Sequence, residues 1–509
     1  MSEAAGPGLA PTAPQGAPDS RARRALHGLL WNYGSSLATV VLQLGYSACT
    51  SRMVSPAAFG AFATASAVTA VVGYFSNSGI ATCLLTAERL SRQLVALALR
   101  VAGVCGVLCF LGAQGVAFGV GFLWDMPELE PMVRLIGFQF LSLPAGLAAV
   151  AALHHCGRTP QVARLQLAGH VTAAVVSLVL LVAGRSPLAL AACAPTSSAV
   201  LLLGALWLLR RENLPDGSRP PVRGLVNASG FFSGFSLAQY AVISAPLWLA
   251  GRLGASAAGH YSRASMFTGV PVTVLAQGIG LTTTPVLAAD RGRSRQAVAD
   301  VLCLGSAIAF IGFGALAGVG PAALNLLLGP GWETAAALVP LLAAGAALTL
   351  LSSVGDSVNQ ARDDRRSLVV TQAWATAAVA LALTVVVARQ SLTLLAAAAV
   401  IGPLACHVAQ LVRWRVQGVV AVRPVLRVHA VHLAAGATLA LAGHWGAVAG
   451  GGPLRGLLLG GAAAFLVLAC ALPLRRRLPL HSVAVRHGLL PRPSWSARVR
   501  SAARPARQQ

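Results

Sequence analysis

Apolar runs of roughly 20 residues recur along almost the whole chain, and they constrain its fold more than any other feature. A helix needs about 20 apolar residues to cross the hydrocarbon core of a bilayer. The sequence therefore predicts an all-α integral membrane protein. We expect fourteen spans in groups of six, six and two: 27–50, 60–86, 94–124, 132–155, 165–183 and 188–209; 228–250, 259–287, 298–328, 334–361, 368–388 and 392–412; 428–446 and 455–474.

The composition agrees with a chain that lies mostly within lipid. Only 10% of the residues are charged, whereas soluble domains carry roughly 25% charged residues. A net charge of +24 is typical of nucleic-acid-binding proteins, but the arginines lie between apolar runs, where membrane topology explains them. The nine cysteines form no CxxC pair and no cluster with histidine. We therefore predict no nucleic-acid partner, no metal site and no cofactor.

All 38 basic residues are arginines, and their distribution predicts how the helices are oriented. With the N-terminus in the cytoplasm, 30 arginines fall in cytoplasmic segments, where positive charge is preferred. We therefore predict an even number of spans in a bacterial inner membrane, with both termini cytoplasmic. Arg100 falls within an apolar run, and seven arginines lie on or near the outer side: Arg52, Arg134, Arg185, Arg252, Arg263, Arg389 and Arg455.

A short segment is nearly repeated in the two halves of the chain. The first copy begins at Arg52 and the second at Arg252, and each joins the first two apolar runs of its half. Such repetition indicates two related helical bundles, in contrast to chance similarity in an Ala-rich chain. One gap aligns Arg52 with Arg252, Gly60 with Gly259, Phe62 with Tyr261, and Ser66 with Ser265.

A second echo supports the repeat. Trp124 and Asp125 precede the fourth run of the first half, and Trp332 and Glu333 precede the fourth run of the second half. Because each half contains an even number of spans, both enter the membrane in the same direction. The predicted organisation is a disordered tail (1–25), an N-lobe (26–209), a Pro- and Gly-containing linker (210–227), a C-lobe (228–412), a helix pair (413–474) and a basic tail (475–509).

These motifs resemble those of the multidrug/oligosaccharidyl-lipid/polysaccharide exporter (MOP) superfamily, and most of all its polysaccharide biosynthesis (Wzx-type) flippases. The resemblance covers about residues 26–412, or 26–474 with the final helix pair. It implies two pseudo-symmetric six-helix lobes that form a V with a cavity open to one side at a time. The residues that carry it are Ser51-Arg52 followed by Pro56-Ala-Ala-Phe-Gly60, Gly259-His-Tyr-Ser-Arg263, Gly329-Pro-Gly-Trp332, and Asn359-Gln-Ala-Arg362.

The resemblance also implies a cargo and partners. The cargo is an oligosaccharide linked to undecaprenyl diphosphate, which is moved from the inner to the outer leaflet for synthesis of cell-surface polysaccharide, including lipopolysaccharide. Other membrane proteins of polysaccharide assembly are expected partners.

Charged side chains inside the apolar runs are candidates for the transport pathway, because each costs about 2.5–3.5 kcal/mol at mid-helix on insertion scales. Arg100 and Arg263 suit a diphosphate or acidic sugars, since guanidinium groups donate to phosphate in pairs. Alternatively, each reaches the membrane interface along its own stem. Arg263 is the stronger candidate because it lies beside Ser262 and Ser265 in the repeat, where the first copy has Thr64.

Three further positions complete the pathway candidates. Asp356, followed by Asn359 and Gln360, makes the most polar helix end in the chain. It suits a coupling cation, H⁺ or Na⁺, or sugar hydroxyls; the alternative is a polar end that faces other helices. Asn77 is the deepest amide and needs a partner on a neighbouring helix or in the cavity. The predicted pathway is therefore Arg263, Arg100, Asn77, Asp356, Asn359 and Gln360.

Other functions fit the sequence less well. An enzyme acting on lipid-linked sugars needs a sizeable outer loop, and the outer loops here are about ten residues or fewer. A cation-coupled multidrug antiporter of the same superfamily usually has carboxylates in its N-lobe, and the first six runs contain none. A lipid II flippase is expected to carry charges in its first helix, where this chain has only Asn32 and Gln43. ATP-driven pumping is excluded because no GxxxxGK[ST] motif occurs.

Overall fold

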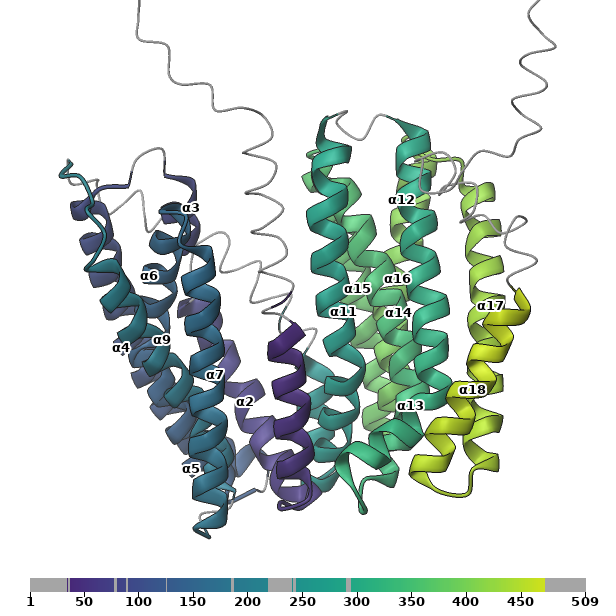
Figure 1. The fold of residues 1–509 in the computed structure, drawn as a ribbon, viewed down its shortest axis with the longest axis horizontal. Coiled ribbons are helices and arrows are strands. Elements are labelled where there is room, and N and C mark those ends of the chain that lie inside the picture. The colour runs from purple at the N-terminus through teal and green to yellow at the C-terminus, as the bar shows by residue number, and fades with distance from the viewer. Residues whose placement is uncertain are drawn as a thin grey trace, which may run out of the picture.

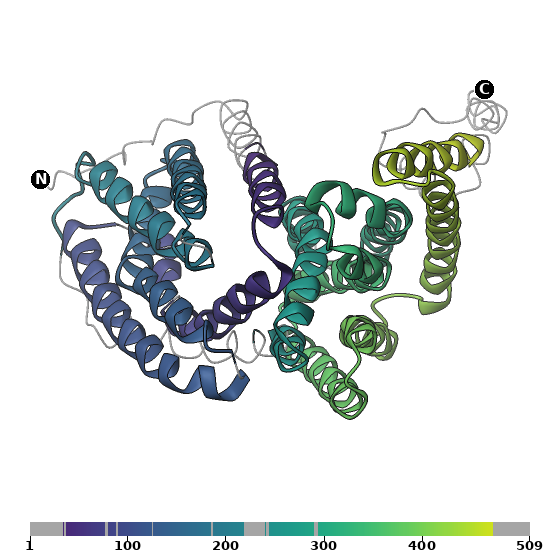
Figure 2. The ribbon, with the colours of Figure 1, turned by 90° about the horizontal axis from the view of Figure 1, so that it is seen from below.

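The structure is a computed structural model, and it describes residues 34, 37–76, 80–87, 90–124, 126–184, 187–217, 240, 244–289 and 294–471. Every regular element within these ranges is helical, as the apolar runs predict. The helices gather into two groups that diverge toward one end (Figure 1). A helix over 37–51 stands between the groups, beside α11 (Figure 2).

We name the two groups by their order in the chain. The N-terminal bundle contains α2 (Pro56–Ser76), α3 (Ile80–Thr86), α4 (Arg92–Trp124), α5 (Leu129–Gly137), η1 (Phe138–Leu141), α6 (Leu143–His155), α7 (Thr159–Val182), α8 (Leu188–Ala191) and α9 (Cys193–Leu209). The C-terminal bundle contains α11 (Ala255–Ala289), α12 (Arg295–Ala307), η2 (Ile308–Gly312), α13 (Phe313–Leu328), α14 (Glu333–Ala361), α15 (Arg365–Arg389), α16 (Leu392–Val416), α17 (Val422–Ala449) and α18 (Pro453–Ala471).

Eleven of the described helical segments are long and apolar enough to cross a membrane, and each matches one of the predicted spans. A twelfth prediction, 259–287, corresponds to α11, whose 35 residues exceed spanning length but include many polar side chains. The predicted run 27–50 is described at 34 and over 37–50, where it is helical, and of the predicted run 228–250 only 240 and 244–250 are described. The predicted run 60–86 is found as α2 and α3, and Asn77 between them is also outside the described residues.

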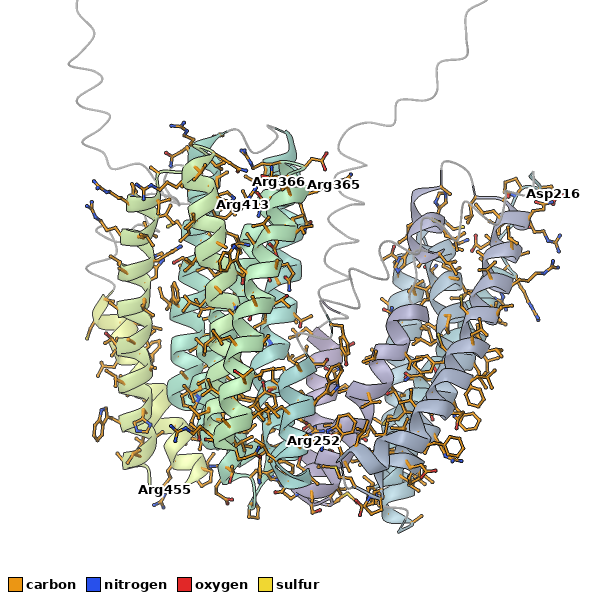
Figure 3. The ribbon with its side chains drawn as sticks, turned by 180° about the vertical axis from the view of Figure 1, so that it is seen from behind. Asp216, Arg252, Arg365, Arg366, Arg413 and Arg455 are labelled. Atoms are coloured by element: carbon orange, nitrogen blue, oxygen red, sulfur yellow. The ribbon has the colours of Figure 1, made fainter. Side chains whose placement is uncertain are left out.

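The arginines labelled in Figure 3 lie at two opposite ends of the helices. Arg365, Arg366 and Arg413, predicted to be cytoplasmic, lie at the end where the bundles diverge. Arg252 and Arg455, predicted to be on the outer side, lie at the opposite end, where the bundles converge.

Candidate functional site

The two bundles meet where α2 crosses α11 at the converging end, and small residues allow this contact. A side chain at Gly60 would overlap the carbonyl of Ala255, and one at Gly259 would overlap the carbonyl of Pro56. Glycine lets helix backbones approach closely, which gives favourable packing where lipid supplies no hydrophobic driving force. The aligned glycines of the repeat therefore belong to a single contact, which we call the junction.

Two tryptophans reinforce the junction by reaching across it. Trp332 Nε1 donates to the carbonyl of Ser51 at 3.1 Å, and Trp124 Nε1 donates to the carbonyl of Trp248 at 3.0 Å. Each tryptophan thus bonds to the opposite half of the chain. Trp332 is 1% exposed, and its ring also packs edge-on against Phe59, 5.7 Å between ring centres. The two tryptophans that repeat in the sequence therefore each link their own half of the chain to the other half.

The first arginine of each repeat copy also contacts the opposite half. Arg52 Nη2 donates to the carbonyl of Leu326 at 3.0 Å. The Arg252 guanidinium lies 6.0 Å from the centre of the Trp124 ring. Both arginines therefore join the halves at the converging end, in addition to ending their own helices.

Arg263 is the charged side chain buried at the junction. It is only 8% exposed, its Nη1 donates to Ser47 Oγ at 3.0 Å, and its guanidinium carbon lies 4.0 Å from the centre of the Phe59 ring. Among the described residues, its Nε has no hydrogen-bond partner. Within the same ranges, no carboxylate forms an ion pair with Arg263. A positive charge without a counter-charge in a low-dielectric region attracts anions strongly.

A cavity of about 490 Å³ opens inside the C-terminal bundle between α11, α14, α15 and α16. Tyr261 and Ser265, which flank Arg263 along α11, line this cavity, whereas Arg263 itself points toward Ser47. Hydroxyl and carboxyl groups lie among apolar walls, an arrangement typical of small-molecule sites. The other polar residues of the lining include Thr268, Thr273, Thr349, Ser352, Ser353, Asp356 and Gln372.

The structure separates the remaining pathway candidates. Asp356 faces the cavity and accepts from Gln410 Nε2 at 2.9 Å. Asn359 is fully buried, and its Oδ1 accepts from Trp414 Nε1 at 2.8 Å, so it joins α14 to α16. Gln360 is exposed at the end of α14, and Arg100 is exposed on α4. Only Asp356 of these residues lines the cavity.

A group of buried polar residues behind Asp356 was not predicted from the sequence. His407 and Gln410 on α16 and His429 and His432 on α17 are each at most 8% exposed and are hydrogen-bonded to one another or to Ser306 on α12. The available signal was the occurrence of histidines one helical turn apart within apolar runs. The hydrogen bonds that connect α12, α16 and α17 could not be predicted from the sequence.

Known proteins resemble this chain at two levels. A family described as "Polysaccharide biosynthesis protein" has a model that matches residues 50–337. No curated protein sequence matches the chain. Among solved structures, the lipid II flippase MurJ in an inward closed conformation superposes with a TM-score of 0.63 at 8% identity, covering 87% of this chain and 98% of that one.

Two further solved structures share the fold. A mutant of the Vibrio cholerae MATE transporter VcmN has a TM-score of 0.55 at 13% identity, covering 79% of this chain and 98% of its own. A MOP superfamily transporter from Pyrococcus furiosus has a TM-score of 0.54 at 15% identity, covering 80% and 97%. At these identities the likeness shows the fold, which is that of MOP-superfamily transporters.

Proposed function

Because this chain belongs to the polysaccharide biosynthesis protein family of MOP-superfamily transporters, we propose that it flips a lipid-linked oligosaccharide across the bacterial inner membrane. The cargo is an oligosaccharide on undecaprenyl diphosphate, which moves from the inner to the outer leaflet. The observation that carries this proposal is Arg263, a buried cation at the junction of the bundles that no described carboxylate pairs with. Arginine suits a diphosphate because its fork of donors matches phosphate oxygens.

The arrangement of the bundles supports a route for the cargo. They diverge at the end that carries Arg365, Arg366 and Arg413 (Figure 3), and the predicted topology places that end in the cytoplasm. The anionic headgroup enters from this side and is drawn toward the basic surface. Separation of α2 from α11 then releases the Arg263 guanidinium from the Phe59 ring and opens the opposite end. The lobes that rock are residues 26–209 and 228–412.

A lipid II flippase is the second candidate function. It is suggested by the lipid II flippase MurJ, which shares the fold with a TM-score of 0.63. Both lipid cargoes carry a diphosphate, so Arg263 does not distinguish between them. The two cargoes are distinguished by the sugar chain on the lipid that accumulates in a strain without the gene.

The test is made in cells that lack the gene. We expect lipid-linked oligosaccharide to accumulate on the inner leaflet, where a glycosidase added to spheroplasts cannot reach it. The wild-type gene restores accessibility. Arg263→Gln restores it at least about tenfold less well, since a hydrogen bond to a charged group contributes about 1.5–3 kcal/mol.

Arg134→Gln is the matched control, because the Arg134 side chain is 41% exposed and forms an ion pair with Glu130 one turn away on the same helix. It is expected to restore accessibility as the wild type does. Both proteins are checked for equal abundance in the membrane. Equal accessibility with and without the gene contradicts the flippase proposal, and accumulation of lipid II in place of oligosaccharide supports the second function.

A further inference from the structure

A chain of hydrogen-bonded polar side chains crosses the inside of the C-terminal bundle, and the proposed flipping mechanism does not use it. It begins at the cavity, where Gln410 Nε2 donates to Asp356 Oδ1 at 2.9 Å and to the carbonyl of Ser352 at 3.0 Å. Gln410 Oε1 lies 3.2 Å from His407 Nδ1, and His407 Nε2 lies 3.3 Å from His429 Nε2. The chain thus passes from α14 through α16 to α17.

At the other end of this series of side chains, two hydrogen bonds converge on the hydroxyl of Ser306. Ser306 Oγ on α12 lies 2.8 Å from His429 Nδ1 and 3.1 Å from His432 Nδ1. Ser306 is fully buried and His432 is 1% exposed. In the described part of the molecule, His432 Nε2 has no hydrogen-bond partner in spite of its burial. An acceptor site on a buried imidazole is therefore left open at this end.

The hydrogen bonds assign the tautomers of the first two imidazoles. The Ser352 carbonyl can only accept, so the amide nitrogen of Gln410 faces it and the amide oxygen faces His407. His407 must then carry its proton on Nδ1 and accept on Nε2. His429 in turn carries its proton on Nε2 and accepts on Nδ1.

The remaining hydrogen bonds follow from these assignments. The Ser306 hydroxyl donates to His429 Nδ1, and the same oxygen accepts from His432 Nδ1. Every hydrogen bond therefore points in one direction, from His432 toward the carboxylate of Asp356. From His432 to His407 the aligned hydroxyl and imidazole groups can pass a proton by successive transfers, and the Gln410 amide links His407 to Asp356 by hydrogen bonds alone.

Within the described parts of the packed helices, Asp356 is the carboxylate that hydrogen bonds connect to these imidazoles. Asp300 on α12 is also a buried carboxylate, and it accepts from Gln296. η2 and α13 contain no titratable residue. Most other titratable groups of these helices are exposed: Arg295 on α12, Glu333 on α14, Arg365, Arg366 and Arg389 on α15, Arg415 on α16, and Arg423, Arg427 and His444 on α17. Arg413 on α16 donates to Ser367, and Cys303 and Cys406 are thiols.

The backbone beside the histidines is irregular. η2, immediately after the segment that holds Ser306, is a turn of π-helix, a form that occurs mostly as single turns at functional sites. The Phe310 ring lies edge-on to His429, 6.1 Å between ring centres, and a side chain at Gly436 would overlap the Phe310 carbonyl. α17 is therefore tightly fitted to η2 at the level of the chain of histidines.

We propose that Asp356, Gln410, His407, His429, Ser306 and His432 form a proton-binding site that connects the cavity of the C-terminal bundle to α17. A proton that reaches His432 binds its Nε2, and the Nδ1 proton of His432 passes to Ser306. The Ser306 proton passes to His429 Nδ1, and the Nε2 proton of His429 passes to His407 Nε2. The site gains one positive charge, which the Asp356 carboxylate balances through Gln410.

The consequence for transport rests on the proposed function. Uptake of one proton neutralises the net charge of this buried site and alters the packing of α17 against η2. We infer that the proton is the coupling ion and that it acts from the C-terminal bundle. The anionic cargo then acts at Arg263, on the other side of α11.

The cargo-free test uses the full chain in lipid bilayers with ¹⁵N-labelled histidine, followed by solid-state NMR during a pH titration. In alkaline conditions we expect His407 and His432 to be protonated on Nδ1 and His429 on Nε2. On acidification the three rings are expected to change in one transition with uptake of one proton. Neutral rings throughout the pH range of the folded protein, or three independent transitions, overturn the proposal.

Two variants identify the site. Asp356→Asn keeps the shape of the side chain and removes its charge, and it is expected to lower the proton affinity of the histidines by about tenfold. His444→Gln is the control, because His444 is exposed on the same helix, α17. If the histidine rings of Asp356→Asn titrate at the same pH as those of the wild type, Asp356 is not their counter-charge. This test holds even if variants of the histidines themselves fail to fold.

The role of the proton in transport is tested separately in vesicles that contain the protein and the lipid-linked oligosaccharide. An imposed pH gradient is expected to change the rate of flipping by the wild type and to have a smaller effect in Asp356→Asn at the same pH values. A wild-type rate that ignores the gradient contradicts proton coupling. If the histidines titrate as expected but the protein does not flip the lipid-linked oligosaccharide, the proton site stands and the proposed cargo is wrong.

Discussion

At the scale of single residues, burial separates side chains that look alike in the sequence. Arg100 and Arg263 both interrupt apolar runs, but Arg100 is exposed on α4 and Arg263 is buried at the junction. An exposed arginine in a spanning helix can reach the membrane interface along its stem. Arg263 cannot, and Ser47 and Phe59 surround its guanidinium instead.

Asp364 provides a test of stability at the same scale. It caps α15, accepting from the Ser367 backbone at 2.9 Å and from Gln417 Nε2 at 2.6 Å. Partial burial raises the pKa of Asp364, but the hydrogen bonds from Ser367 and Gln417 outweigh this and lower it overall. The charged carboxylate therefore stabilises the folded state above the ordinary pKa of about 3.9, and this stabilisation is lost as the pH falls through the lowered pKa.

We expect Asp364→Ala to reduce the free energy of unfolding at pH 7 by about 1 kcal/mol, the usual contribution of such a cap. The difference from the wild type is expected to narrow in acid, because protonation removes the same interaction. The free energies of unfolding of the variant and the wild type are measured in detergent at several pH values. Asp363→Asn is the control, since Asp363 is exposed and its positive φ of 53° suits asparagine. A difference that is independent of pH contradicts the role of the carboxylate.

At the scale of helices, the apolar runs predicted most elements because a spanning helix must be apolar over a fixed length. α11 departs from this pattern, and the reason is its position between the bundles, where Arg263, Ser265 and Thr268 face protein. The chain of histidines could not be predicted, because it depends on how α12, α16 and α17 are placed side by side. The aligned glycines were visible, but the overlap of Gly60 with Ala255 required the structure.

The junction between α2 and α11 yields a prediction at this scale. A methyl group added by Gly60→Ala would overlap the Ala255 carbonyl, so α2 must move away from α11. We expect this to destabilise the closed junction by about 1–3 kcal/mol. Pulsed electron spin resonance between labels on the α4–α5 and α13–α14 connections should then show a larger population with the converging ends apart.

Gly103→Ala is the matched control, because the space around Gly103 on α4 is open. It is expected to leave the distance distribution unchanged. A Gly60→Ala protein with the same distances as Gly103→Ala would show that the close contact does not hold the ends together.

At the scale of the whole molecule, the two halves of the chain contact each other reciprocally. Trp332 reaches Ser51 and Trp124 reaches Trp248, so the residues that repeat in the sequence are those that join the bundles. The repeat predicted that two bundles exist, but packing between the two copies is a tertiary property that no local pattern contains. The structure is therefore closed at one end and divergent at the other, as Figure 1 shows.

The most direct test of flipping uses purified protein in vesicles that contain undecaprenyl-diphosphate-linked oligosaccharide in both leaflets. A glycosidase added outside can cleave only the outer half in protein-free vesicles. With the wild type it is expected to cleave nearly all of the oligosaccharide, and with Arg263→Gln at least about ten times more slowly. Cleavage that stops at half in the presence of folded wild-type protein contradicts flipping by this protein.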